Sequence, residues 1–214
     1  GILAVDYDIK FEGTKGDDGW LHKDISDQDA LNIMSSCSDF VLKTFKEDFP
    51  PYDGRKHVDT VTLYLGTLTG KDYATVNGPD IHIRRSYIDN YVGDAKKEFT
   101  GMMFSLMTFV WQWNGKNQTP HGLRSGIAYF VRLKAGYARQ DWRRPGSGYK
   151  WDQGTDITLR FLEYCDGLYN KKGSFIADLN QKMRNSYSDD YFKQLLGKPV
   201  GQLWNEYKTK HRTP

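Results

Sequence analysis

The sequence predicts an α+β fold, with a small mixed or antiparallel sheet near the N-terminus and a mainly helical C-terminal half. Two observations predict it. Between residues 4 and 84, β-branched and aromatic residues gather in short runs that are separated by glycine-, asparagine- and proline-bearing turns. From residue 94 onward, apolar residues recur at helical spacing instead. Strands early in the chain and helices late in it are typical of α+β domains.

The N-terminal region is expected to form a strand, a loop and a long helix. The strand covers residues 4–11, where every second side chain is apolar: Val5, Tyr7, Ile9 and Phe11. A polar loop follows at residues 13–19. Residues 27–49 repeat apolar side chains at helical spacing behind Ser26, which is a suitable N-cap, and Pro50 and Pro51 end the helix.

Three further strands are expected before the helical half. They cover residues 58–65, 73–76 and 80–84, and turns at residues 66–70 and 77–79 join them. In the last strand, His82 alternates with two isoleucines. It therefore faces either a functional cleft or solvent, and it is the histidine to test first. His22, His57 and His211 stand in polar contexts and are interpreted as surface residues.

Helices dominate the remainder of the chain. We expect them at residues 94–111, 123–138, 156–169, 174–185, 189–196 and 200–210, with a loop at residues 143–154. No repeat, low-complexity tract or linker divides the chain. The sequence therefore predicts one domain over residues 1–214, which is long enough to bury a sizeable core.

Composition limits the classes of partner. The net charge of +3 comes from 30 basic and 27 acidic residues that are interspersed, which is typical of a solvated surface and not of a nucleic-acid footprint. No apolar run is long enough to cross a bilayer. We therefore expect neither nucleic-acid nor membrane partners. The chain opens at Gly1 without a charged-then-apolar leader, so composition does not indicate a compartment.

The two cysteines leave two alternatives open. Cys37 and Cys165 either form a disulfide, which would close a large loop and stabilise the fold by about 4 kcal/mol, or remain two buried thiols that pack as small apolar residues. Asn117 begins a formal glycosylation sequon, but Pro120 directly behind Thr119 disfavours its use.

The predicted helix at residues 94–111 carries the most informative pattern. Two histidines four residues apart on one helix can bind Zn²⁺ together, and a glutamate beside the first can polarise a bound water. Ser105 and Phe109 hold that spacing here, and Leu106 follows Ser105. None of these three side chains supplies a good zinc ligand or a general base. Glu98, two turns earlier, is interpreted as a solvated carboxylate or the partner of a nearby lysine, and not as an acid catalyst.

Residues 98–115 resemble the active-site helix of the plant basic secretory protein family, which are zincin-like metallopeptidases. The family pattern reads His-Glu-Met-Thr-His-Val-Trp-Gln-Trp-Asn, and its last five residues stand unchanged in this chain. Its first His, its Glu and its second His fall on Ser105, Leu106 and Phe109. Residues 121–137 resemble the following segment, where the family's Glu, the third ligand that the resemblance implies, falls on Ser125 and its Asp on Tyr129.

The resemblance extends almost over the whole chain. Further matches lie at residues 80–83, 151–154, 161–166 and 195–200, although Thr155 replaces a tyrosine that usually follows the glycine. The resemblance implies a zincin-like fold and a protein that is secreted to the extracellular space or the vacuole. With the ligand positions replaced, we expect the protein to have no metal or other cofactor and no proteolytic activity.

In that architecture a cleft borders the former active-site helix, and replacement of the ligands makes its floor apolar. The expected ligand-binding residues are Ser105, Leu106, Phe109, Arg124, Ser125 and Tyr129, with Asp80, His82 and His121 as further candidates at its border. The alternative is that these side chains simply fill the space that the metal left.

Two functions remain open at this point. The first is a binding protein that holds a small organic molecule, a glycan or a peptide in the cleft, in plant defence or specialised metabolism. The second is a metal-independent enzyme that acts on a plant metabolite by acid–base or cyclisation chemistry, with Tyr129, Arg124 or His82 as the catalytic candidates. The two differ in whether a titratable group is held at the ligand.

Overall fold

The computed structural model describes residues 4–13 and 20–212. Of the predicted loop at residues 13–19, only Gly13 is among these residues. The chain forms two compact units, one of residues 1–41 and 56–111, and one of residues 42–55 and 112–214. Among the described residues, no helix has the length and apolarity needed to span a bilayer. A single domain over residues 1–214 stays a prediction.

The first unit contains a four-stranded mixed sheet, which confirms the α+β prediction. Its order is β1 (Asp6–Phe11), β4 (Thr60–Gly66), β6 (Asp80–Arg84) and β5 (Ala74–Asn77). The first three strands are parallel, and β5 runs antiparallel to β6. All four strands lie close to their predicted positions. In β1, β5 and β6 the burial alternates from residue to residue, whereas β4, inside the sheet, is buried over most of its length.

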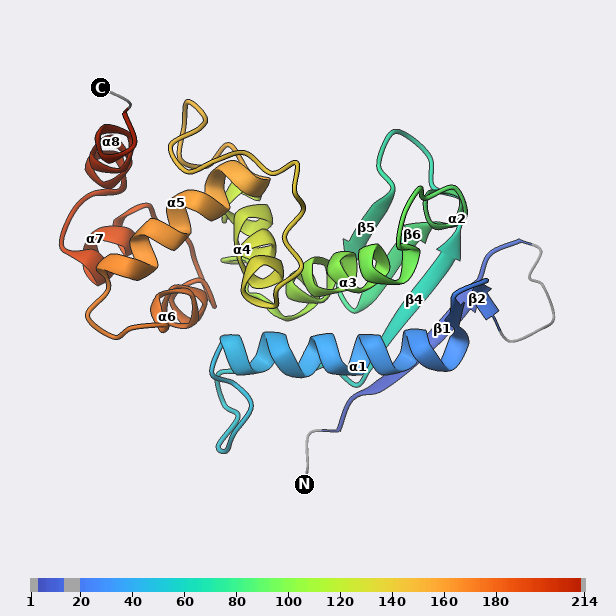
Figure 1. Cartoon of the computed structure of the whole chain (residues 1–214). Coiled ribbons are helices and arrows are strands. Elements are labelled where there is room, and N and C mark those ends of the chain that lie inside the picture. The colour runs from blue at the N-terminus through green and yellow to red at the C-terminus, as the bar shows by residue number, and fades with distance from the viewer. Residues whose placement is uncertain (1–3, 14–19, 213–214) are drawn as a thin grey trace. The chain divides into compact units, whose positions relative to one another are not determined.

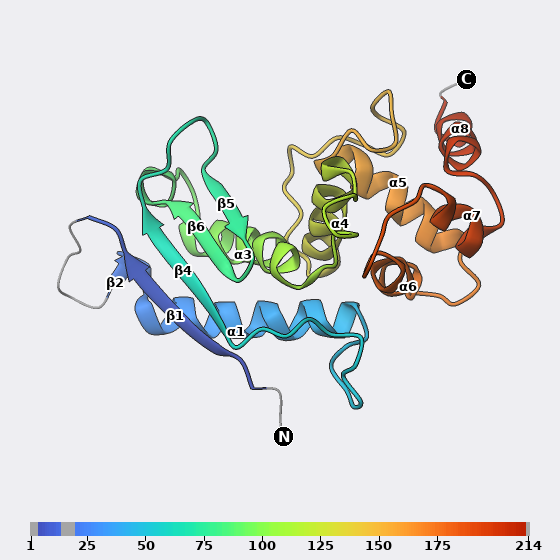
Figure 2. The same cartoon turned by 180° about the vertical axis from the view of Figure 1, so that it is seen from behind.

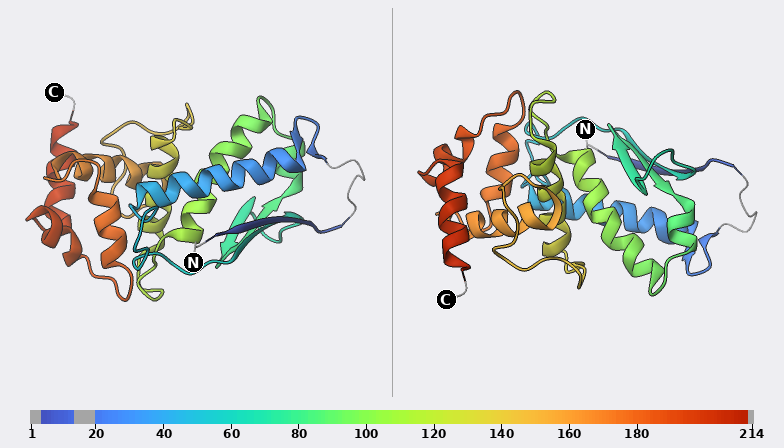
Figure 3. Two further views of the ribbon diagram at one scale, coloured as in Figure 1. Left: turned by 90° about the horizontal axis from the view of Figure 1, so that it is seen from below. Right: turned by 90° about the horizontal axis from the view of Figure 1, so that it is seen from above.

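Three helices belong to this unit: α1 (Asp27–Thr44), α2 (Arg85–Asp89) and α3 (Ala95–Trp111). The strands lie behind α1 in Figure 1 and in front of it in Figure 2, so α1 covers one face of the sheet. The left view of Figure 3 shows β1, an edge strand of the sheet, below α1 in the picture. Buried side chains of α1, α3 and the facing strands, such as Val41, Met103 and Leu63, form the core of this unit.

The start of α1 follows from its sequence. The Ser26 hydroxyl accepts a hydrogen bond from the Asp29 N–H at 2.9 Å, and the Asp29 carboxylate accepts one from the Ser26 N–H at 3.1 Å. This reciprocal pair is a capping box. The helix ends at Thr44, five residues before the predicted end, because Lys46 adopts a left-handed backbone with φ of 56°.

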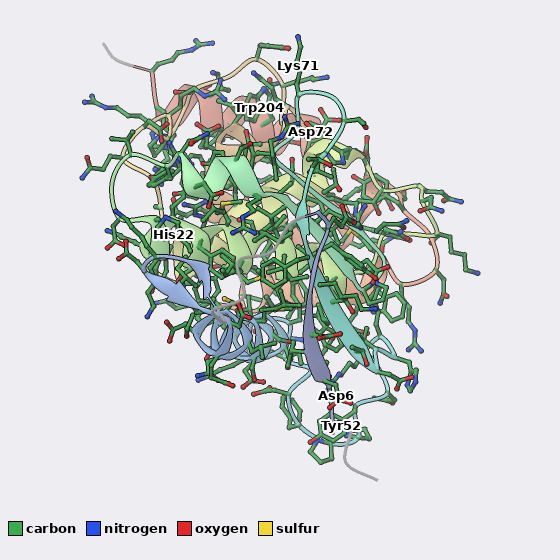
Figure 4. All side chains as sticks on the ribbon, turned by 90° about the vertical axis from the view of Figure 1, so that its right-hand side faces the viewer. Asp6, His22, Tyr52, Lys71, Asp72 and Trp204 are labelled. Atoms are coloured by element: carbon green, nitrogen blue, oxygen red, sulfur yellow. The ribbon has the colours of Figure 1, made fainter. Side chains whose placement is uncertain are left out.

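A small hairpin was not predicted. Strands β2 (Trp20–His22) and β3 (Ile25–Ser26) are too short to show an alternating pattern. The interpretation of His22 as a surface residue was wrong: the side chain, labelled in Figure 4, is only 8% exposed, and its Nδ1 accepts a hydrogen bond from the Asp24 N–H. A five-residue helix, α2, was also missed for want of length.

The second unit is helical. It contains α4 (His121–Lys134), α5 (Thr155–Leu168), α6 (Phe175–Lys182), α7 (Asp190–Leu196) and α8 (Val200–Lys210). An aromatic core holds the last four together, and Phe161 is its centre, with rings of Phe192, Trp204 and Tyr207 at 5.4–6.1 Å between centroids. Helix α4 ends at Lys134, four residues before its predicted end at residue 138, because Gly136 adopts a left-handed backbone with φ of 86°.

Both cysteines are free, buried thiols, one in each unit. The alternative of two buried thiols is therefore confirmed, and Cys37 and Cys165 form no disulfide in this structure. Burial raises the pKa of Cys37 and of Cys165 well above the ordinary value of a thiol, since the thiolate loses its hydration. Neither side chain is a nucleophile at neutral pH.

Candidate functional site

Helix α3 holds three of the predicted ligand-binding residues in the first unit. Ser105 and Leu106 are buried, and Phe109 is half-buried one turn after Ser105. The helix begins because the Asp94 carboxylate accepts a hydrogen bond from the Lys97 N–H at 2.9 Å. Residues 105 and 109 therefore share a helix face, as their spacing predicts.

Contacts with α1 fix the position of α3. The Trp111 indole N–H donates a hydrogen bond to the Ser38 hydroxyl at 2.7 Å, with both side chains buried. The rings of Phe40 and Phe104 meet edge to face at 5.3 Å. Phe104 and Trp111 lie before and after the three site residues in sequence. Their contacts with α1 therefore hold the part of α3 that carries Ser105, Leu106 and Phe109 in a fixed position.

A zinc ion does not fit these residues. The α3 face offers a neutral hydroxyl, an alkyl chain and a phenyl ring, and none of these replaces an imidazole nitrogen or a carboxylate as a ligand. Among residues 4–13 and 20–212, no group of three or more His, Cys, Asp and Glu side chains is arranged to hold a metal ion.

Ser125 on α4, in the second unit, has a structural use. Its hydroxyl donates a hydrogen bond to the Gly122 carbonyl at 3.1 Å and accepts one from the Thr155 N–H at 3.1 Å. Thr155 begins α5 and has a left-handed backbone with φ of 46°. The side chain at the position where the resemblance implies a third ligand therefore holds the start of the neighbouring helix.

Two glycines let α4 approach the segment around the start of α5. A Cβ atom at Gly122 would lie 1.8 Å from the Asp152 carbonyl oxygen, and one at Gly126 would lie 2.3 Å from Thr158 Cγ2. Real side chains never approach so closely. The backbones meet at these positions only because both residues lack a side chain.

Arg124 and Tyr129, also on α4, are half-buried. Burial lowers the pKa of the Arg124 guanidinium. The backbone carbonyl of Arg124 accepts a hydrogen bond from the Gln112 side chain at 3.2 Å. The Tyr129 ring stacks on Trp142 with centroids 4.9 Å apart, and the Arg132 guanidinium lies 5.6 Å from the Trp142 ring. Of the three α4 residues, Tyr129 therefore lies beside the half-buried Trp142, whereas Ser125 contacts the start of α5.

His82 lies on the face of the sheet opposite to its core. Its strand neighbours Ile81 and Ile83 are buried, whereas the His82 side chain is 30% exposed. The ring stacks on Tyr64 at 4.6 Å, and its Nδ1 lies 3.8 Å from a carboxylate oxygen of Glu12. Asp80 lies on the same face, and His121 is exposed at the start of α4. His82 is thus on a different face from the one that α1 covers.

Two buried carboxylates were missed or misread from sequence. Glu98 on α3 is not solvated, as was expected, but only 5% exposed, and its oxygens accept hydrogen bonds from Tyr87 at 3.2 Å and Tyr91 at 3.5 Å. Both tyrosines lie in or beside α2, which was not predicted. The two phenol groups therefore hold the Glu98 carboxylate in a fixed position.

The second is Asp156, in the first turn of α5. Its carboxylate accepts hydrogen bonds from the Arg143 guanidinium at 2.8 and 3.0 Å, from the Arg143 N–H at 2.7 Å and from the Thr155 hydroxyl. Burial raises the pKa of Asp156, but these hydrogen bonds outweigh it and lower the pKa to about 2. The pair fixes the loop before α5.

Comparisons with known proteins agree with the resemblance. The profile of the family described as "Peptidase of plants and bacteria" (BSP) matches residues 3–207. A protein of Boswellia serrata described as "Basic secretory protease" is 34% identical over 65 residues, which make up 30% of this chain and 72% of that protein. No solved structure matched the chain.

Proposed function

Because the chain belongs to the BSP family of plant and bacterial peptidases, we propose that it is a zinc-free, non-proteolytic member that binds a small organic molecule, a glycan or a peptide. The family supplies the scaffold, and the proposal concerns what this chain does with it. Plant defence or specialised metabolism is the setting we propose.

One observation carries the proposal. Residues 105, 106 and 109 are Ser, Leu and Phe on a helix that the Trp111–Ser38 hydrogen bond holds in place. A zinc peptidase needs nitrogen or carboxylate ligands and a general base at such positions. The helix is held in place by this hydrogen bond, but it carries neither zinc ligands nor a general base at these positions. An apolar helix face with one hydroxyl favours ligand binding over hydrolysis.

In the first unit we assign ligand contacts to Ser105, Leu106 and Phe109. Arg124, Ser125 and Tyr129 stay predicted ligand-binding residues of the second unit, taken by itself. On α3, Phe109 is the half-buried member and offers an aromatic ring. On α4, Tyr129 and Arg124 offer a hydroxyl and a guanidinium, whereas Ser125 already serves the Thr155 N–H. We expect the ligand to be largely apolar with a few polar groups.

A metal-independent enzyme is the second candidate function, and Glu98 is the observation that favours it. Its carboxylate is buried and held by hydrogen bonds from Tyr87 and Tyr91, and a carboxylate is one of the side-chain groups that can carry acid–base chemistry. Tyr129, Arg124 and His82 stay the further catalytic candidates. Incubation of the protein with an extract of its source tissue, followed by mass spectrometry, separates the two functions: bound but unchanged compounds favour the first, and transformed compounds the second.

The relative's description as a secretory protease supports secretion of this chain as well. We propose that the mature protein resides outside the cell or in the vacuole. Both compartments contain the glycans, peptides and stored metabolites that the proposal names as ligands.

We expect the purified protein to hold no stoichiometric zinc and to cleave no denatured protein substrate, because both histidine ligands and the general base are replaced. Elemental analysis after chelator treatment measures the first, and a casein assay the second. A BSP-family peptidase that keeps the His-Glu-x-x-His pattern serves as positive control. About one zinc per chain after chelation would overturn the proposal.

Replacement of Phe109 by alanine should weaken ligand capture from the extract about tenfold, since the half-buried ring is removed from the contact surface. The free energy of unfolding should fall by only about 1–2 kcal/mol, less than for a fully buried phenylalanine. Phe109→Leu, which keeps an apolar side chain, is the matched control and should retain most of the capture. Equal capture by wild type and Phe109→Ala would move the ligand site away from α3.

A further inference from the structure

The two units differ strongly in charge. Of the 30 lysines and arginines, 21 lie in the unit of residues 42–55 and 112–214, together with only 12 of the 27 acidic residues. The formal charge from the sequence is therefore +9 for this unit and −6 for the other, although the whole chain carries +3. A unit of about 120 residues with this charge attracts anions over distances of about a Debye length.

The loop before α5 presents part of this charge in an ordered setting. Arg144, Tyr149 and Lys150 are exposed, and Tyr149 is 77% exposed. The loop is anchored to α8: the Lys208 ammonium donates hydrogen bonds to the Gly146 and Gly148 carbonyls, and the Gly146 N–H donates one to the Tyr207 hydroxyl at 2.6 Å.

Further hydrogen bonds and contacts hold the loop from both ends. The Tyr149 N–H donates to the Gln153 side chain at 2.9 Å, and Arg143 is bound to Asp156. A Cβ atom at Gly146 would lie 2.4 Å from His211 Cβ, so the loop lies directly against the end of α8. The backbone that carries the exposed Tyr149 ring is therefore held in place.

The end of α8 adds further cations beside this loop. Lys210 and Arg212 are exposed on either side of His211, which contacts Gly146. Three acidic residues near them are paired with other bases: Asp156 with Arg143 at 2.8 Å, Glu163 with Arg160 at 3.6 Å and Glu206 with Lys198 at 2.9 Å. Asp152, two residues after Lys150, is half-buried and offsets one of the four exposed cations. Arg144, Lys150, Lys210 and Arg212 thus give this surface a net positive charge, and we name it the α8 loop surface.

We propose that the α8 loop surface binds an acidic polysaccharide, one that carries a carboxylate on its sugar rings. Guanidinium and ammonium groups pair with such carboxylates. The exposed Tyr149 ring offers an aromatic face on which a sugar ring can pack, and charges at regular intervals along the polymer meet several cations at once. This site is separate from α3 and does not depend on the proposed function.

Two other anionic partners fit less well. A membrane surface is bound by cations together with inserted apolar side chains, and residues 143–150 contain no aliphatic side chain besides Pro145. Single-stranded nucleic acid is bound by successive aromatic platforms, whereas this loop presents one exposed ring. Charge and a single aromatic ring favour a carboxylated sugar polymer.

Titration of the full-length protein with polygalacturonate, read by calorimetry at low and at physiological salt, tests the proposal. We expect binding that weakens as salt rises. The double variant Arg144→Glu, Lys150→Glu should lose at least about tenfold in affinity, and Tyr149→Ala about threefold to fivefold.

A matched control removes the same charge elsewhere on the unit. Lys171 and Lys172 are exposed just after the far end of α5, a helix of 14 residues whose start adjoins the loop. Their double change to glutamate should alter affinity less than about twofold. The proposal is overturned if both double variants lose affinity for polygalacturonate equally, or if the wild type does not bind it. It is also overturned if the wild type binds neutral dextran equally well, or binds anionic vesicles or oligo-deoxythymidine more tightly. Unchanged melting temperatures exclude unfolding of the variants.

Discussion

Gly122→Ala is expected to lower the free energy of unfolding by about 3 kcal/mol or more, the largest effect of any single change that we consider. The added methyl group would lie 1.8 Å from the Asp152 carbonyl oxygen, which is backbone and cannot rotate away. Alanine inside a helix normally stabilises a protein by about 0.5–1 kcal/mol relative to glycine. A loss of stability in Gly122→Ala would therefore indicate the close contact with Asp152.

Gly201→Ala is the matched control. This glycine also lies in the first turn of a helix, α8, and no atom lies within 4 Å of an added Cβ. It should be neutral or slightly stabilising. Denaturant unfolding of the two variants beside the wild type measures both effects. Similar stabilities for Gly122→Ala and the wild type would mean that α4 and the segment before α5 do not approach as described.

Asp156→Asn should lower the free energy of unfolding at pH 7 by about 2 kcal/mol, because the Arg143 guanidinium then loses its charged partner. The effect depends on pH with a defined sign. The folded-state pKa of Asp156 lies at about 2, below the value of about 3.9 for an unfolded chain. The stability from this group is therefore complete above about pH 4 and is lost as the pH falls towards 2.

The measurement is the difference in unfolding free energy between wild type and Asp156→Asn at several pH values between 7 and 2, because that difference cancels the other carboxylates. It should shrink steadily below pH 4. Asp48→Asn, which changes an exposed carboxylate of the same unit, should show almost no difference at any pH. A constant difference from pH 7 to pH 2 would contradict the lowered pKa of Asp156.

Much of the fold was predictable from sequence, because long periodic segments determine their own structure. Helix α3 begins one residue after its expected start, and β6 coincides with its expected range. The β2–β3 hairpin and α2 were not predictable, since elements of two to five residues carry no period. The end of α1 depends on the left-handed conformation of Lys46, a residue type that gives no signal for it.

The candidate site was predictable only in its residue types. Replacement of the zinc ligands can be read directly from residues 105, 106 and 109, but the use of Ser125 cannot. Its hydrogen bond joins residues that are 30 positions apart, and its geometry exists only after α4 and α5 have packed. Glu98 was misread for the same reason, because Tyr87 and Tyr91 bury it from elements that the sequence did not reveal.

The placement of the cysteines gives the protein a built-in reporter for partial opening. Cys37 lies in one unit and Cys165 in the other, and the chain has 2 cysteines in total. Since only an exposed thiolate reacts quickly with an alkylating reagent, each thiol is modified only when its own surroundings open. Peptide mapping after timed alkylation therefore assigns a separate opening rate to each unit of the native protein, without any engineered label.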